Sequence, residues 1–194
     1  MDKLLLASKS PRRIEILKKY RDDLITEAPF VDESVSGRFK PEELVMAIAL
    51  KKALSIIQNG HYEDTIILAA DTVVYCDRII GKPQDRNDAF SILKSLSGKT
   101  HKVFTGFAIM HSNINKNLID FEETDVIFEK FSDEMIENYL NTNEYTDKAG
   151  AYGIQGYGEL LVNSISGSYP NVMGLPISRI NKHLWELYRF NLLN

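Results

Sequence analysis

The segment richest in candidate chemistry is LASKSPRR, at residues 6–13. An apolar run that favours a short strand ends there, and Ser10 followed by Pro11 favours the start of a helix. A helix N-terminus, two serine hydroxyls and the guanidinium groups of Arg12 and Arg13 can together hold a phosphate. The other interpretation is an ordinary helix cap followed by two solvated arginines, and the pattern alone leaves both open.

A single acidic residue, Asp71, interrupts the apolar run of residues 65–77. The run is dense in β-branched residues, which is typical of a buried strand. An isolated buried carboxylate is costly, so such a group is paired, bound to a metal or used in catalysis. Asp71 is therefore a candidate catalytic residue, with a salt bridge or a position at the strand's end as the structural alternative. Thr72 beside it also fits an ordinary strand residue.

Several basic side chains further along the chain can supply positive charge. Lys51 and Lys52 share a helix expected after Pro41, so one can face a site while the other stays solvated. Lys82 follows a strand and precedes a proline that restricts the local backbone, which can direct its ammonium at a phosphate. Taken alone, each is more often a surface lysine, and Glu33 in its polar loop is more often an exposed acid.

A glycine-rich segment, GAYGIQGYG at residues 150–158, has four glycines in nine positions. Such a segment lets a ligand approach the backbone, and Gln155 within it offers an amide donor and an acceptor to the edge of a base. The alternative is a flexible turn. The four histidines are scattered, and neither GxGxxG nor the GxxxxGK motif occurs, which argues against a zinc site, a histidine-based triad and the common phosphate loops.

The elements that must position these residues follow from hydrophobic periodicity and turn residues. The turn-prone residues 112–117 predict a hairpin, and the glycine-rich and proline-containing segments 147–158 and 166–176 predict loops. The order of elements predicts an α/β or α+β fold with a mixed sheet. Strands are expected at residues 3–7, 24–28, 65–77, 79–80, 102–111, 118–128 and 160–165, and helices from residue 11, over 41–60, 88–96 and 132–140, and from 177.

Composition narrows the class of protein. The 194 residues are 44% hydrophobic and 26% charged, with 23 Lys and Arg against 27 Asp and Glu and a formal net charge of −4. These values are typical of a globular chain and argue against disorder and against a basic face for long nucleic acid. A single cysteine, Cys76, with no membrane-length apolar run and no secretory signal, predicts a cytoplasmic protein without membrane contact. We find no internal repeat or linker, so we expect one domain over residues 1–194.

Six motifs occur in order along nearly the whole chain: LASKSPRR, AADT around Asp71, GKPQD around Lys82, LSGKTHKVFTG, DKAGAYGIQG and GSYPNVMGLP. Together they resemble the Maf family of nucleotide pyrophosphatases. The resemblance implies an elongated, two-lobed α/β fold around a twisted mixed sheet, with the site in a cleft between the lobes. It also implies hydrolysis of a nucleoside triphosphate between the α and β phosphates, with help from a divalent metal, Mg²⁺ or Mn²⁺.

The resemblance assigns roles to residues of this chain. Asp71 matches the family's catalytic proton acceptor. Glu33 and Asp71 offer hard oxygen ligands for the metal, which leaves open whether Asp71 acts as base or as ligand. A metal held by both carboxylates would also explain an ionised acid in an apolar strand. The remaining matches at the site, which can neutralise a triphosphate or contact it, are Ser8, Arg12, Arg13, Lys52 and Lys82.

Arg12, Thr72 and Gln155 match positions that separate substrate groups within the family, and this combination resembles the group acting on dTTP and UTP. We expect Gln155 and Thr72 to read the edge of uracil or thymine. The alternatives are a pyrophosphatase for 7-methyl-GTP or another modified nucleotide, and a non-enzymatic nucleotide-binding protein acting in septum formation. The sequence leaves a homodimer open, since twofold symmetry is the commonest closed symmetry.

Overall fold

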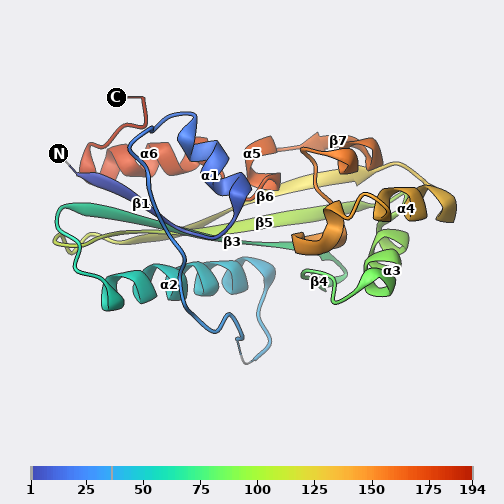
Figure 1. Cartoon of the computed structure of the whole chain (residues 1–194), viewed down its shortest axis with the longest axis horizontal. Coiled ribbons are helices and arrows are strands. Elements are labelled where there is room, and N and C mark those ends of the chain that lie inside the picture. The colour runs from blue at the N-terminus through green and yellow to red at the C-terminus, as the bar shows by residue number, and fades with distance from the viewer. Residues whose placement is uncertain (1, 36, 194) are drawn as a thin grey trace. The chain divides into compact units, whose positions relative to one another are not determined.

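The computed structural model describes residues 2–35 and 37–193, and its elements follow the expected order (Figure 1). The strands are β1 (Lys3–Ala7), β2 (Ile25–Glu27), β3 (Thr65–Cys76), β4 (Arg78–Ile80), β5 (Thr100–His111), β6 (Leu118–Phe128) and β7 (Val162–Ser166). The helices are α1 (Pro11–Lys18), α2 (Pro41–Asn59), α3 (Arg86–Leu96), α4 (Asp133–Leu140), α5 (Tyr169–Val172) and α6 (Ile177–Tyr188), with 3-10 turns η1 (Glu144–Asp147), η2 (Ala149–Ala151) and η3 (Tyr157–Leu161).

The strands form a mixed sheet, which confirms the predicted α/β class. Their order is β2-β1-β3-β5-β6-β7, and β4 pairs with β3 off this path. β1 runs parallel to β2 and β3, whereas β4 is antiparallel to β3 and β7 is antiparallel to β6. Residues 112–117 join the neighbours β5 and β6 as the predicted hairpin. Among the described residues, no helix has the length and apolar character needed to cross a membrane.

The contacts divide the chain into two compact units. The first comprises the described residues within Met1–Asp71, Thr105–Glu122 and Gly174–Asn194, and the second comprises Thr72–Phe104 and Glu123–Met173. Strands β3, β5 and β6 contribute residues to both units. A single domain over residues 1–194 and a cleft between two lobes stay predictions.

In the first unit, α2 lies on one face of the sheet, and α1 and α6 lie on the other (Figure 1). The core against α2 consists of apolar side chains from three strands and the helix: Leu5, Ala7, Ile67, Ala69, Ala108, Met110, Ala49, Ala53 and Ile56. Alternate residues of a strand share a face, so Asp71 extends the row of Ile67 and Ala69 on the side that α2 covers. The sheet thereby presents an acid to a helix.

The close approach of α2 to the sheet depends on Gly106 of β5. A Cβ at this position would lie 2.5 Å from the carbonyl carbon of Val45 and 2.6 Å from the backbone nitrogen of Met46, both on α2. Only glycine fits at that distance. Gly106 therefore sets how closely the side chains of α2 reach the strands.

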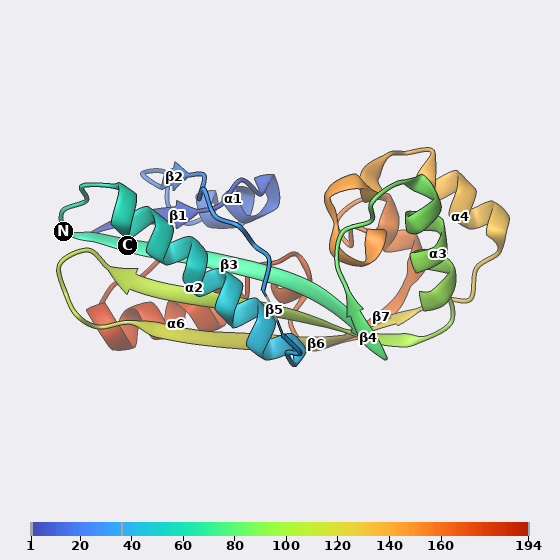
Figure 2. The same ribbon diagram turned by 90° about the horizontal axis from the view of Figure 1, so that it is seen from below.

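In the second unit, α3 and α4 lie side by side (Figure 2). Arg86 Nη2 donates to Glu137 Oε2 at 2.6 Å, and Lys94 Nζ donates to Asp133 Oδ2 at 2.9 Å. Helix α3 starts two residues before the predicted residue 88, because the Asp85 carboxylate accepts a hydrogen bond from the backbone nitrogen of Asp88 at 2.8 Å and caps the helix.

The two segments predicted to be loops carry short helical turns instead. Residues 147–158 contain η2 and the start of η3, and α5 lies within residues 166–176. Ser168 Oγ caps α5 by accepting from the backbone nitrogen of Asn171 at 3.3 Å. Turns of three to five residues are too short to produce a hydrophobic period, which is why the sequence pattern did not reveal them.

We expect Gly106→Ala to lower the free energy of unfolding by about 2 kcal/mol, because the methyl group must displace the backbone of α2. Urea denaturation followed by circular dichroism measures the change. Gly81→Ala is the matched control, since a Cβ at Gly81 has no neighbouring atom within 4 Å. Equal midpoints for the two variants would contradict the role given to Gly106.

Candidate functional site

Lys52 of α2 lies between two carboxylates. Its Nζ donates to Asp71 Oδ1 at 2.7 Å and lies 3.0 Å from Glu33 Oε1. The side chains of Lys52 and Asp71 are only 7% and 14% exposed, whereas that of Glu33 is 54% exposed. One pair is therefore largely withdrawn from water and the other lies at the surface. The buried acid expected at Asp71 is paired, and Lys52 supplies the compensating charge.

Helical spacing decides which of the two adjacent lysines faces Asp71. Val45, Ala49 and Ile56 form the buried side of α2, and Lys52 lies on the same side. Lys51 points to the surface and donates from Nζ to the backbone oxygen of Ser34 at 2.8 Å. Both lysines thus contact the segment that carries Glu33. Lys52 contacts the side chain of Glu33, and Lys51 contacts the backbone oxygen of Ser34.

Arg13 of α1 belongs to the same cluster. Its Nε donates to the backbone oxygen of Gly174 at 2.7 Å, which fixes the guanidinium group. Burial lowers the pKa of Arg13, while the negative charges of Asp71 and Glu33 act to raise it. The guanidinium group therefore interacts electrostatically with both acids. Arginine nevertheless stays charged at neutral pH. The first unit therefore gathers two cations and two carboxylates.

The loop between β1 and α1 has a different internal arrangement from the predicted one. Ser10 occupies the N-cap position but its side chain makes no capping bond. Its backbone nitrogen instead donates to Ser8 Oγ at 3.1 Å, and Ser8 is buried. Ser8 therefore holds the turn that leads into α1. Arg12 lies half-buried at the start of that helix, and contacts of Ser8 and Arg12 with a substrate stay predictions.

The other predicted residues, Thr72, Lys82 and Gln155, belong to the second unit. Lys82 is exposed after β4, and Gln155 is exposed in the glycine-rich segment. The backbone nitrogen of Gly150 donates to the oxygen of Gly81 at 3.0 Å, which brings these two segments together. Thr72 directly follows Asp71 on β3, so the two side chains point to opposite faces of the strand.

Sequence reasoning missed Glu144, which supports the segment bearing Gln155. Glu144 Oε1 accepts from the hydroxyl of Tyr139 and from the backbone nitrogen of Gly158, each at 3.1 Å. Glu144 Oε2 accepts from the backbone nitrogen of Tyr157 at 2.9 Å. No residue pattern could have revealed it, because two of its partners are backbone groups distant in sequence.

The donor set of the first unit fits a divalent metal shared with a substrate. Across residues 2–35 and 37–193, no three His, Cys, Asp or Glu side chains gather in a way that could hold a metal. Glu33 and Asp71 provide two carboxylates beside one ammonium. Mg²⁺ is commonly held by one or two carboxylates together with substrate phosphates and water, and this pair is of that kind.

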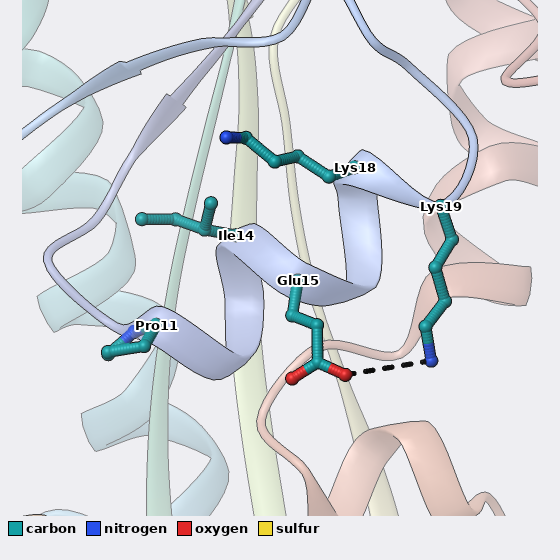
Figure 3. Close-up of a pocket in the computed structure, with 5 residues that line it drawn as sticks. All are labelled: Pro11, Ile14, Glu15, Lys18 and Lys19. Carbon is teal, nitrogen blue, oxygen red and sulfur yellow. Dashed lines mark ion pairs between the residues drawn. The ribbon is translucent and has the colours of Figure 1, made fainter.

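A hollow beside α1 is lined by none of the predicted site residues (Figure 3). It is lined by Pro11, Ile14, Glu15 and Lys18 of α1 and by Lys19, which directly follows that helix. Lys19 Nζ lies 3.9 Å from Glu15 Oε1, and both side chains are more than half exposed. A solvated pair of this kind supplies little binding energy, so we assign this hollow no catalytic role.

The sequence profile of the Maf-like protein family matches residues 3–187. The chain belongs to the Maf family. It is 45% identical over 179 residues to the dTTP/UTP pyrophosphatase of Caldanaerobacter subterraneus subsp. tengcongensis, covering 92% of this chain and 86% of that protein. It is 42% identical over 193 residues to the dTTP/UTP pyrophosphatase of Alkaliphilus oremlandii, covering 100% of both. The resemblance of the six motifs to the Maf family is confirmed.

A solved structure shares the fold of this Maf family chain at low sequence identity. The HAM1 protein from Coxiella burnetii superposes with a TM-score of 0.51 at 14% identity, covering 96% of this chain and 100% of that one. Identity at this level supports the α/β fold alone.

The contrast between the two lysines of this Maf family chain gives a test of the cluster. We expect Lys52→Met to lower the free energy of unfolding by about 3 kcal/mol, because Asp71 loses its cation in a largely buried position. Lys51→Met removes the same charge from an exposed contact and should cost less than about 1 kcal/mol. Urea titration of both variants measures the difference, and a smaller loss for Lys52→Met than for Lys51→Met would refute the assignment.

Proposed function

We propose that this chain hydrolyses dTTP and UTP to the nucleoside monophosphate and pyrophosphate by cleaving the anhydride between the α and β phosphates. Relatives 41–47% identical over nearly the full length carry the name dTTP/UTP pyrophosphatase. The observation that carries the proposal is the cluster of Arg13, Lys52, Glu33 and Asp71 in the first unit. Cations that neutralise phosphates beside acids that hold a metal or accept a proton meet the needs of phosphate hydrolysis.

Lys52 can serve a substrate without giving up its role in the fold. An ammonium group has three N–H donors, and two of them are directed at Asp71 and Glu33. We assign the third to a phosphate oxygen. Arg13 Nε donates to the backbone oxygen of Gly174, and we assign the guanidinium group of Arg13 to phosphate binding.

We assign Asp71 the proton of the attacking water. Its Oδ1 bonds to Lys52, so the second carboxylate oxygen is the atom that we give this role. The water oxygen bonds to the α phosphorus, and the bond from the α phosphorus to the oxygen that bridges the α and β phosphates breaks. Pyrophosphate leaves, and the nucleoside monophosphate remains. Glu33 and Asp71 would hold Mg²⁺ or Mn²⁺, which when bound neutralises phosphate charge.

Selection of the base is assigned to the second unit. We propose that Gln155, with Thr72, reads the donor and acceptor groups of uracil or thymine, since a primary amide carries both kinds of group. Lys82 would add positive charge for the phosphates, as would Arg12 from α1, and Ser8 would contact them through the turn after β1. A net charge of −4 favours free nucleotides over long nucleic acid as substrates, and we place this activity in the cytoplasm, with a homodimer left open.

A panel of nucleotides assayed for pyrophosphate and orthophosphate tests the activity. We expect dTTP and UTP to release pyrophosphate, and Asp71→Asn to lower kcat at least about a hundredfold while dTTP still raises the melting temperature. Asp77→Asn, which alters an exposed acid directly after the same strand, is the matched control and should keep its activity.

Each adverse result of that panel has one meaning. Orthophosphate as the primary product would contradict cleavage between the α and β phosphates. A preference for 7-methyl-GTP would favour the modified-nucleotide alternative, and binding of dTTP without turnover would favour a non-enzymatic regulator of septum formation. Unchanged turnover in Asp71→Asn would remove Asp71 from the mechanism.

Metal removal gives a separate test. We expect EDTA to abolish turnover and added Mn²⁺ or Mg²⁺ to restore it, because the two carboxylates are proposed to share the metal with the phosphates. Glu33→Gln should raise the metal concentration needed for half-maximal rate at least about tenfold. Glu43→Gln, which alters an acid at the start of α2, is the control. Turnover that persists in EDTA would contradict the metal assignment.

A further inference from the structure

The loop that carries Gln155, residues 153–158, is closed by two side chains. At its start, the backbone nitrogen of Gly153 donates to the hydroxyl oxygen of Tyr139 at 3.2 Å, and that hydroxyl donates to Glu144 Oε1. At its end, the backbone nitrogens of Gly158 and Tyr157 donate to the two oxygens of the same carboxylate. Both ends of the loop therefore meet at Glu144, with Gln155 between them.

The glycines of this loop serve that closure. A Cβ at Gly156 would overlap Glu144 Oε2, and a Cβ at Gly153 would lie 2.9 Å from Glu144 Oε1. A Cβ at Gly158 would lie 2.6 Å from the backbone oxygen of Gly153. At Gly156 and Gly153 the absence of a side chain thus makes room for the carboxylate of Glu144.

Glu144 is itself held in place from both directions. Its backbone nitrogen donates to Thr142 Oγ1 at 3.2 Å, directly after α4. Its backbone oxygen accepts from Lys148 Nζ at 2.6 Å. Tyr139, the other residue of the closure, lies in α4 and is buried. The loop is therefore anchored by hydrogen bonds to α4, a helix of the second unit.

We propose that Glu144 is a positioning residue for base selection, which fixes the backbone on both sides of Gln155 so that the amide meets the base in one orientation. This inference rests on the proposed function. Discrimination between uracil and cytosine requires that a donor and an acceptor be aligned, because the two bases exchange these groups at one edge. A loop that must be ordered on binding aligns them less well than one ordered beforehand.

The readout is the ratio of kcat/KM for UTP to kcat/KM for CTP. A residue with a purely structural role lowers both values by the same factor and leaves the ratio unchanged. We expect Glu144→Gln to lower the ratio about tenfold, because the amide nitrogen of glutamine would face a backbone N–H where a carboxylate oxygen now accepts. KM for UTP should rise more than kcat falls. Glu159→Gln, which removes the same charge from an exposed position nearby, should leave the ratio as in the wild type.

An unchanged ratio in folded Glu144→Gln would overturn the inference. If that variant does not fold, Tyr139→Phe decides, since it removes the hydroxyl group that contacts Gly153 and Glu144 Oε1 and keeps the aromatic ring. We expect a loss of about threefold in the ratio for Tyr139→Phe, and no loss would overturn the inference.

Two further measurements separate this inference from the proposed function. Failure of the wild type to release pyrophosphate from UTP would overturn the proposed function. Gln155→Glu tests the contact with the base directly. Loss of discrimination in Gln155→Glu but not in Glu144→Gln would leave the proposed function standing and overturn the positioning role alone.

Discussion

The first unit depends on one ion pair that is largely withdrawn from water. Asp71 continues an apolar row of β3, where an uncompensated carboxylate would be unfavourable, and Lys52 supplies the opposite charge at 2.7 Å. That ammonium reaches the strand only because α2 packs closely on the sheet, over Gly106. The close packing of α2 on the sheet therefore also fixes the position of the Lys52 charge. The same lysine binds Glu33.

Much of this arrangement was accessible from local pattern. The β-branched run around Asp71 predicted the strand, and an acid within it predicted a partner. The apolar period of α2 also contained the choice between the two lysines, because Lys52 falls on the side of Val45, Ala49 and Ile56. Helix ends were predictable where a proline or glycine marks them and less so at α3, which Asp85 starts early. Local sequence patterns were therefore sufficient to predict most of the helices and strands.

The parts that could not be predicted depend on contacts between distant residues. Ser10 has the right identity and position for a capping residue, yet Ser8 takes the hydrogen bond that organises the turn. The glycines around Gln155 indicated a close approach to the backbone, and the structure places the carboxylate of Glu144 against Gly156, while approach of a ligand stays a prediction. An acid that accepts from backbone nitrogens more than ten residues away leaves no signature in composition or period.

The charged cluster around Lys52 and the loop of residues 153–158 differ in how well each tolerates substitution. Asp71 and Lys52 form a largely buried ion pair of the fold and are also assigned roles in the proposed hydrolysis. A substitution at either residue therefore alters stability and activity together. Gln155 lies in a loop whose ends are fixed by Glu144 and Tyr139, through hydrogen bonds to the backbone nitrogens of Gly153, Tyr157 and Gly158. A substitution at position 155 leaves these backbone donors in place. Under the proposed function, a loop closed in this way separates the choice of nucleotide from the hydrolysis of its phosphates.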